Sequence, residues 1–544
     1  LSADKKIKEL TVTDYAEVQV RGFIEGYYGN PWSLEDRIDL MKFGGEIKMN
    51  QYVFAPKDDP YHNSQWRDLY PTENLENIKK LAQAGNENKC FFVYALHPFM
   101  NRPFNFNNYD ADLATVKAKY LQVIKSGVRQ IALLEDDATG SSAANLSRLL
   151  IDLTDWLTDL KKNKYSDLKT DILYCPNDYM GNGSSAKLKG INASANRQVH
   201  MVMTGNAIWG QVTANFADNF YNNVASNGVA GRYPYRWVNW PCNDNYKTGL
   251  IMGGHNTILH TKINGRKYEG IILNPMQHSE PSKVAIFTAA DYCWKPWDAK
   301  EEGDQAWEDS FKYIDHVTAL ESDSSKALRE VAKHMIYQGP VQTAGRQAKF
   351  EESVALKNKL AEIQKKVEAG TVTTAELDDM RNEFKTIYDA AVKYLTDAAN
   401  TRMSEQITPF LSCLRDECEA NIELMDALKA VQTKENDKVW EHYSAAQTLY
   451  ERSRTYGFRY VNETKYATAG LLYIVPFTEK VMKNVSDTVK QIIDPEHIKL
   501  ERTLIYRVGG TENSGNTGNA ANAIDGNLNT NFQIQTDQQT GDYV

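Results

Sequence analysis

Eight short apolar runs between residues 18 and 276 constrain the fold of this 544-residue chain more than any other feature. The runs are VQVRGFIEG, NQYVFAP, CFFVYALHP, QIALLEDD, DILYCPNDY, VHMVMTGN, YRWVNWP and YEGIILNPM. Helical patterns that end at a glycine, such as NLENIKKLAQAG and LATVKAKYLQVIKSG, lie between most of them. Eight alternating strand and helix units are typical of a (β/α)8 barrel, so the sequence predicts an α/β fold of the TIM type.

Nearly every apolar run ends in polar side chains that can carry out chemistry, and these are Glu25, Lys57, His97, Asp136, Asp137, residues 177–179, Thr204, Asn239 and Asn274. Barrel enzymes build their active sites at the carboxyl ends of the strands, so this placement supports the barrel. A doubly wound open sheet is the competing architecture. The chain contains no G-x-G-x-x-G or P-loop motif, with which such sheets bind phosphates, and we therefore prefer the barrel.

Helical periodicity replaces the strand pattern beyond the barrel. Apolar residues recur at helical spacing over 356–367 and 403–425. Thr373 with Glu376 predicts a capping box at the start of another helix. We interpret these stripes as the core-facing sides of a helical bundle and not as a cofactor site.

Charge and composition argue against several classes of function. The chain has 62 basic and 71 acidic residues, and this net charge of −9 argues against a nucleic-acid partner and mildly against a polyanionic substrate. The six cysteines lack a C-x-x-C pair and the ten histidines form no H-x-H or H-E-x-x-H motif, so neither a disulfide framework nor a metal site is expected. There is no G-x-S-x-G elbow for a serine nucleophile and no apolar run long enough to span a bilayer. The class of chemistry that remains is acid/base catalysis by carboxylates, without a cofactor.

The stretch IALLEDDATG places three acids, Glu135, Asp136 and Asp137, directly after an apolar strand. A retaining glycosidase ordinarily holds its two carboxyl groups about 5–5.5 Å apart across the scissile bond, and an inverting one about 6.5–9.5 Å apart. Adjacent residues have Cα atoms only about 3.8 Å apart, and along a strand their side chains point to opposite faces. The pair Asp136–Asp137 therefore suits a substrate-assisted mechanism better, in which the 2-acetamido group of the sugar is the nucleophile.

In such a mechanism one carboxylate holds the acetamide N–H while its neighbour protonates the leaving oxygen. Two neighbouring acids in a dry pocket resist ionising together, so one of them is expected to stay protonated and to serve as the general acid. The alternative interpretation is an acidic cap of the following helix, in the segment EDDATGSSAANLSRLL. A cap accounts for one aspartate but not for three acids in a row, so we prefer the catalytic interpretation.

Seven segments together resemble glycoside hydrolase family 84, the β-N-acetylglucosaminidases that include protein O-GlcNAcases and bacterial enzymes often labelled hyaluronidases. The segments are RGFIEGYYGNPW, APKDDPYH, LLEDDATG, CPNDYMG, TGNAIW, WVNWPCND and ILNPMQHSE, in the order of the family, within residues 10–300. The resemblance implies a retaining exo-β-N-acetylglucosaminidase that acts on GlcNAc-containing glycans or glycoproteins through an oxazoline intermediate. It also implies a secreted or cell-surface location in a bacterium.

The resemblance further implies roles for ten residues. Asp136 is expected to orient and polarise the acetamido group, Asp137 to be the general acid/base, and Tyr179 to bind near the acetamide as the oxazoline forms. Thr204 and Trp237 are expected to line the acetamide pocket, with Asn239 supporting the acidic pair. The groups expected to hold the sugar hydroxyls are the backbone of Gly26 and the side chains of Lys57, Asp244 and Asn274.

Two other functions stay open at this point, an endo-acting hyaluronidase and a carbohydrate-binding or adhesion protein on an inactive barrel. Glu135 stands where the family often has an apolar or aromatic residue, and we expect it to add charge locally or to pair with a cation. The predicted segments are 1–18 as a linker or the end of a preceding α/β domain, 19–305 as the barrel, 306–497 as the helical bundle and 498–544 as the start of a truncated, discoidin-like carbohydrate-binding module.

Overall fold

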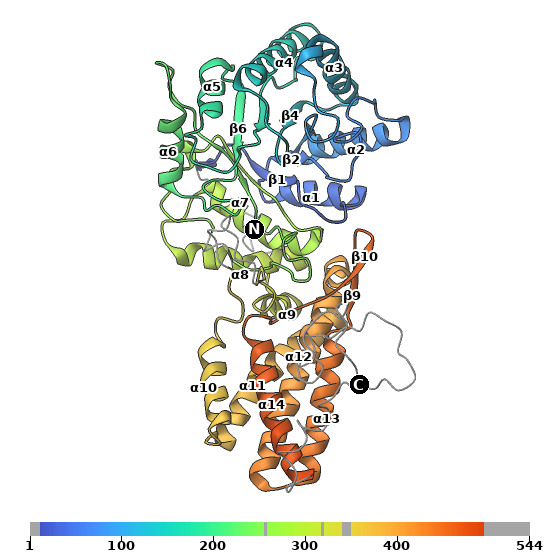
Figure 1. The fold of residues 1–544 in the computed structure, drawn as a ribbon, viewed down its shortest axis with the longest axis vertical. Helices are drawn as coiled ribbons and strands as arrows, with labels where there is room; N and C mark the ends of the chain where they lie inside the picture. The colour runs from blue at the N-terminus through green and yellow to red at the C-terminus, as the bar shows by residue number, and fades with distance from the viewer. Residues whose placement is uncertain (1–10, 255–257, 317–319, 340–349, 494–544) are drawn as a thin grey trace, which may run out of the picture.

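The computed structural model describes residues 11–493, apart from 255–257, 317–319 and 340–349. The described part of the molecule is elongated, with a barrel at one end and a helical region at the other (Figure 1). The predicted module over 498–544 lies outside the described residues, and so does most of the predicted segment 1–18. The predicted domain boundaries therefore stay predictions, although the helix α8 already begins at Lys300.

Eight parallel strands close into a barrel in which each strand pairs with the next along the chain and β8 pairs with β1. The strands are β1 (Arg21–Glu25), β2 (Gln51–Phe54), β3 (Phe91–Leu96), β4 (Gln130–Leu134), β5 (Ile172–Cys175), β6 (Val199–Met203), β7 (Tyr235–Val238) and β8 (Gly270–Leu273). Each strand falls within one of the eight apolar runs. The predicted (β/α)8 fold is confirmed.

Helices on the outside of the barrel connect its strands, because neighbouring parallel strands need a crossover. They are α1 (Leu34–Glu46), α2 (Thr72–Asn88), α3 (Tyr109–Lys125), α4 (Ala143–Asn163), α5 (Ala186–Ser194), α6 (Ala214–Val224) and, after β8, α7 (Ser279–Trp294). Side-chain caps begin several of them, such as Ser142 for α4 and Thr213 for α6. Between β7 and β8 the described residues form a long loop with one short 3-10 turn, Gly265–Lys267, in place of an α-helix.

The strands read as unbroken apolar runs because both of their faces are buried. Alternate strand residues point inward and form a separate core within the barrel, which includes Ile24, Val53, Ala132 and Ile272. Their neighbours along the strands, such as Phe23, pack outward against the helices. The six cysteines are unpaired and buried, as expected of small apolar side chains.

The helical region confirms the predicted stripes and adds a β-hairpin that the sequence did not indicate. Its elements are α8 (Lys300–His316), α9 (Asp323–Ala332), α10 (Lys357–Glu368), α11 (Thr374–Asp397), α12 (Thr401–Thr433), α13 (Asn436–Ser453), the antiparallel strands β9 (Gly457–Tyr460) and β10 (Glu463–Tyr466), and α14 (Ile474–Ile493). The predicted capping box of Thr373 and Glu376 begins α11. Within the described ranges, no helix is long and apolar enough to cross a membrane.

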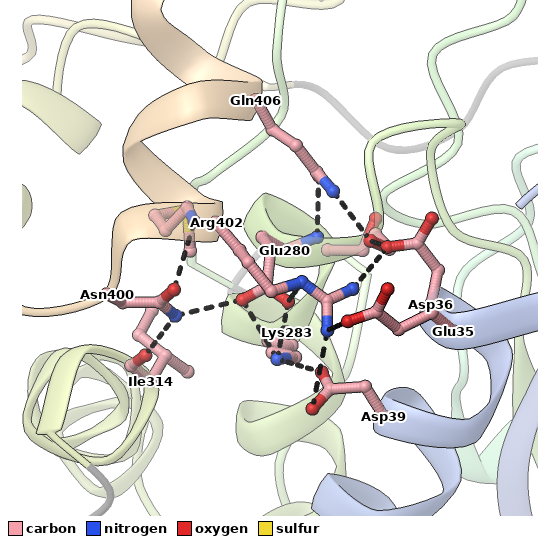
Figure 2. A network of polar contacts seen from close by, with 12 residues as sticks. Glu35, Asp36, Asp39, Glu280, Lys283, Ile314, Asn400, Arg402 and Gln406 are labelled. Carbon is pink, nitrogen blue, oxygen red and sulfur yellow. Dashed lines mark hydrogen bonds and ion pairs between the residues drawn. The ribbon is translucent and has the colours of Figure 1, made fainter. Parts of the chain in front are cut away.

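A polar junction joins the helical region to the barrel (Figure 2). Arg402, in the first turn of α12, contacts Asp36 Oδ1 on α1 at 2.5 Å and lies 3.7 Å from Glu280 on α7. Glu280 also pairs with Lys283 at 2.8 Å, and Asn400 Nδ2 donates to its second oxygen at 2.9 Å. Because Glu280 is buried and fully partnered, the junction holds the two parts of the molecule in a fixed relation.

Candidate active site

A cavity of about 440 Å³ lies at the carboxyl ends of the barrel strands. All ten residues predicted for the site line it, and they are Gly26, Lys57, Asp136, Asp137, Tyr179, Thr204, Trp237, Asn239, Asp244 and Asn274. Trp237 comes from β7, and the other nine come from the loops after β7 and after six other strands. The closed barrel is what brings them to one place, because all its parallel strands end at the same rim.

Asp136 is the buried member of the acidic pair. Its Oδ2 accepts a hydrogen bond from Lys57 Nζ at 2.7 Å. His97 Nε2 donates to the main-chain oxygen of Asp136 at 2.7 Å, and the same nitrogen lies 3.5 Å from Asp136 Oδ1. Burial alone would raise the pKa of Asp136, but Lys57 and then His97 outweigh burial and lower this pKa to about 2. Asp136 is therefore ionised at neutral pH.

One oxygen of this buried carboxylate is left for a ligand. Asp136 Oδ1 is buried and has no hydrogen-bond partner among the described residues. Buried polar atoms without a partner are uncommon, because desolvating a carboxylate oxygen is costly. Asp136 Oδ1 therefore offers an acceptor for a donor group of a bound substrate.

Asp137 reaches the same cavity because its backbone leaves the strand geometry. Its φ is +56°, in the left-handed region, and β4 has already ended at Leu134. The expectation that the two aspartates point to opposite faces does not hold here, since it assumes an extended strand. Two phenolic hydroxyls donate to the Asp137 carboxylate, Tyr28 to Oδ2 at 2.8 Å and Tyr179 to Oδ1 at 2.9 Å.

Tyr179 and Lys57 line the cavity and also contact the acidic pair itself. The hydroxyl of Tyr179 lies on Asp137, and burial followed by the Asp137 charge raises the pKa of Tyr179; its expected role at the acetamide stays a prediction. The buried ammonium of Lys57 pairs with Asp136, and its expected contact with the sugar hydroxyls stays a prediction. This cation, more than repulsion between the two acids, determines that Asp136 is ionised.

A chain of side-chain hydrogen bonds fixes the wall opposite the acidic pair. Asn239 Oδ1 accepts from Trp237 Nε1 at 2.8 Å and from Asn274 Nδ2 at 3.0 Å. Asn274 Oδ1 in turn accepts from the N–H of Gly26 at 3.2 Å. A Cβ at Gly26 would lie 2.5 Å from the Trp237 ring, so only glycine fits there. Asn239 thus supports Trp237 and Asn274, whereas we expected it to support the aspartates.

Tyr28 is a site residue that the sequence reasoning missed. Besides its hydroxyl bond to Asp137, its N–H donates to Asp244 Oδ2 at 3.1 Å. Burial, with a smaller contribution from Asp137, raises the pKa of Tyr28 to about 12, so it stays a hydrogen-bond donor. Its place two residues after Gly26 in the motif GFIEGYYGNPW was the available signal. His97, which directly follows β3, was named among the polar residues at the strand ends but was given no role in the site.

Glu135, which lacked an assigned role, pairs with a cation as expected. It is fully buried, and its Oε2 accepts from Lys187 Nζ and from the Tyr174 hydroxyl, both at 2.6 Å. Its Oε1 accepts from the N–H of Ser141 at 2.7 Å. Glu135 therefore anchors the loop after β4, which carries the two aspartates, to β5 and α5.

A closed parallel barrel with paired carboxylates, carboxamides and an indole ring at its carboxyl rim is typical of enzymes that hydrolyse sugars. In the described ranges, no three His, Cys, Asp or Glu side chains are arranged to hold a metal ion. The profile of the family described as beta-N-acetylglucosaminidase matches residues 21–333. The chain belongs to this family, which corresponds to glycoside hydrolase family 84.

Known relatives agree with this assignment. The protein O-GlcNAcases of Rattus norvegicus and Mus musculus are each 28% identical to the chain over 282 residues, which is 50% of this chain and 29% of theirs. The chain thus matches less than a third of the length of these relatives.

The helical region is shared with solved structures as well. CpGH84D is 33% identical with a TM-score of 0.79, over 88% of this chain and 76% of its own. CpGH84B is 25% identical with a TM-score of 0.71, over 86% of this chain and 78% of its own. A mutant O-GlcNAc hydrolase of Thermobaculum terrenum shares the fold at 19% identity and a TM-score of 0.68, over 88% of this chain and 97% of its own.

Proposed function

We propose that this protein is a retaining exo-β-N-acetylglucosaminidase that removes terminal β-linked GlcNAc from glycans or glycoproteins with the help of the substrate's own acetamido group. The observation that carries the proposal is the unequal environment of the two adjacent carboxylates. Asp136 is ionised by Lys57 and has one buried oxygen without a partner, whereas Asp137 lies exposed at the cavity between two tyrosine hydroxyls.

In the first step, Asp136 Oδ1 accepts the acetamide N–H and so directs the acetamide oxygen at the anomeric carbon. This oxygen forms a bond to C1 as the bond from C1 to the glycosidic oxygen breaks, and Asp137 gives its proton to the departing oxygen. The product in the pocket is an oxazolinium ion, the protonated form of the oxazoline, whose N–H stays hydrogen-bonded to the ionised Asp136; transfer of this proton to Asp136 gives the neutral oxazoline. A protonated carboxyl group has one O–H to donate and keeps acceptor lone pairs on both oxygens, so Asp137 can give up its proton while Tyr28 and Tyr179 keep their bonds to it.

In the second step, Asp137 takes a proton from a water molecule, which attacks C1 from the side that the leaving group vacated. The bond from C1 to the acetamide oxygen breaks, the acetamide is restored, and GlcNAc leaves with its anomeric configuration retained. Asp244 and Asn274 line the same cavity, and this supports the binding of a single terminal sugar. An endo-acting hyaluronidase needs a cleft that is open on both sides of this sugar.

The test compares Asp137→Asn and Asp136→Asn on aryl N-acetyl-β-glucosaminides with good and poor leaving groups. Asp137→Asn is expected to slow the poor leaving group by about 10²–10⁴-fold and the good one far less, because only the poor one needs its proton. Asp136→Asn is expected to slow both. Asp167→Asn, whose half-exposed carboxylate pairs with Arg129 ahead of β5, is the control and should change neither.

Two results would refute the proposal. One is efficient cleavage of a plain aryl glucoside, because this substrate lacks the acetamide. The other is release of oligosaccharides in place of GlcNAc from a defined glycan panel, which would favour the hyaluronidase. Activity that survives in both aspartate variants would contradict the assigned roles.

A further inference from the structure

The β9–β10 hairpin of the helical region reaches back to the rim of the barrel (Figure 1). There the Tyr460 hydroxyl donates to the main-chain oxygen of Tyr28 at 2.8 Å. Two further bonds run between the hairpin and the same barrel loop, since Asn30 Nδ2 donates to the Arg459 oxygen at 2.8 Å and Asn30 Oδ1 accepts from the N–H of Val461 at 2.7 Å. The hairpin therefore holds the loop after β1 through both main-chain and side-chain atoms.

Tyr28 is the residue of this loop that contacts the acidic groups of the cavity. Its hydroxyl donates to Asp137 and its N–H to Asp244, while its oxygen accepts from Tyr460. One residue thus joins the helical region to two carboxylates at the mouth of the barrel. Tyr28 is 47% exposed, so packing around its side chain contributes little to holding it in this position.

Side-chain packing holds the hairpin itself in place. Tyr460 is only 5% exposed, and Lys247, which lines the cavity, lies 4.7 Å above its ring. Phe458 packs with its ring 5.0 Å from that of Phe410 on α12 and 5.5 Å from that of His278 beside α7. The hairpin is therefore fixed to the bundle and to the barrel, and it can support the half-exposed Tyr28.

We propose that Tyr460 is a positioning residue for the reaction, which holds the Tyr28 loop so that the Tyr28 hydroxyl keeps the Asp137 carboxyl aimed at the glycosidic oxygen. This inference rests on the proposed role of Asp137 as the general acid. When the support is lost, Asp137 is aimed less well, and a proton that must travel to a poorly placed oxygen is transferred more slowly.

The test is Tyr460→Phe, which keeps the buried ring and removes only the hydroxyl. We expect kcat for a phenyl N-acetyl-β-glucosaminide to fall by about tenfold, the effect of one lost hydrogen bond, with KM little changed. A dinitrophenyl substrate, which departs without a proton, should lose less than about twofold. A structural defect alone would slow both substrates equally, and that result would overturn the proposal.

Two further variants distinguish a loss of positioning from a general defect in folding. Tyr466→Phe lies on the same hairpin and is 55% exposed, with no hydrogen bond to its hydroxyl among the described residues, and it should leave both substrates unchanged. Asn30→Ala, which removes the other two bonds, should reproduce the selective loss with the phenyl substrate.

A double-mutant cycle identifies the route. If Tyr460 acts through Tyr28, then Tyr28→Phe and Tyr460→Phe are not additive, and the double variant should be no slower than Tyr28→Phe alone. Additive losses would overturn the proposed route. If Asp137→Asn slows good and poor leaving groups alike, then the proposed function fails. If Asp137→Asn slows the poor leaving group selectively but Tyr460→Phe slows both substrates equally, then this inference fails and the proposed function stands.

Discussion

Buried carboxylates lie next to cations both at the mouth of the barrel and at the junction between the barrel and the helical region. The two places differ in whether both oxygens of the carboxylate have hydrogen-bond partners. At the junction, both oxygens of Glu280 are partnered, one by Lys283 and the other by Lys283 and Asn400 (Figure 2). At the mouth, Lys57 satisfies one oxygen of Asp136 and the second has no partner among the described residues. Ion pairing alone therefore does not distinguish a structural carboxylate from a catalytic one.

The unused acceptor is what distinguishes them. A buried carboxylate whose two oxygens both have partners within the protein needs no further donor, and Glu135 beside the acidic pair is an example. A buried oxygen without a partner is costly in the empty protein and becomes favourable when a donor arrives. The three consecutive acids contain both kinds, which explains why their sequence alone was ambiguous.

The largest expected effects are a loss of activity at the mouth of the barrel and a loss of stability at the junction. Asp137→Asn should lower kcat/KM by about 10²–10⁴-fold and change the free energy of unfolding by less than about 0.5 kcal/mol, because Asp137 is exposed. Glu280→Gln should lower the free energy of unfolding by about 2–4 kcal/mol, because it leaves Lys283 and Arg402 with less compensation, and it should leave kcat nearly unchanged. Urea unfolding and steady-state rates measure both.

Glu35→Gln is the matched control for Glu280→Gln. Glu35 also lies near Arg402, at 3.7 Å, but its side chain is 83% exposed, so the free energy of unfolding should change by no more than about 0.5 kcal/mol. A loss of activity in Glu280→Gln as large as that in Asp137→Asn would show that the two regions are not functionally separate.

A smaller effect is expected at the opposite end of the barrel, where the partly buried His200 lies between two acids. Burial lowers the pKa of His200, but the carboxylates of Asp171 and Glu269, at 3.8 Å and 2.7 Å from its ring nitrogens, outweigh burial and raise this pKa to about 9. A pKa that is raised on folding stabilises the protein fully below the unfolded value of about 6.5, and this stabilisation is lost as the pH rises through 9. We expect about 1–3 kcal/mol to disappear over this window.

The measurement is the free energy of unfolding from pH 6 to pH 10 for the wild type and for His200→Gln. The variant should be less stable at pH 6 and should lose less stability towards pH 10. Parallel curves for the two proteins would contradict the assigned pKa of His200.

The smallest expected effect follows from removing the cation at the mouth of the barrel, the ammonium of Lys57. In Lys57→Met, burial of Asp136 is no longer opposed by the ammonium, so the pKa of Asp136 should rise. The acid limb of kcat against pH should then move to higher pH, and activity should fall by about tenfold for each pH unit below the new pKa. The limb is measured between pH 4 and pH 8, and an unmoved limb would mean that Lys57 does not control Asp136.

Local patterns in the sequence were sufficient for the barrel, the helical stripes and the residues of the rim. Strand and helix periodicity depends on neighbours a few positions away, and parallel strands that close into a barrel must bring their carboxyl ends together. That is why Asp136, Thr204 and Asn274 could be assigned to one cavity although they lie far apart in the chain. Trp237, by contrast, was assigned only through the resemblance to the family.

Which atoms meet within the cavity was decided by the tertiary structure. Lys57 and Asp136 are 79 positions apart, and Tyr460 and Tyr28 are 432 apart, so no local pattern contains either contact. The positive φ of Asp137, which turns both aspartates into one cavity, likewise depends on how the loop after β4 is anchored by Glu135. The sequence by itself determined which residues reach the rim, and only the packing of distant segments decided their partners, because hydrogen-bond geometry depends on positions in space and not along the chain.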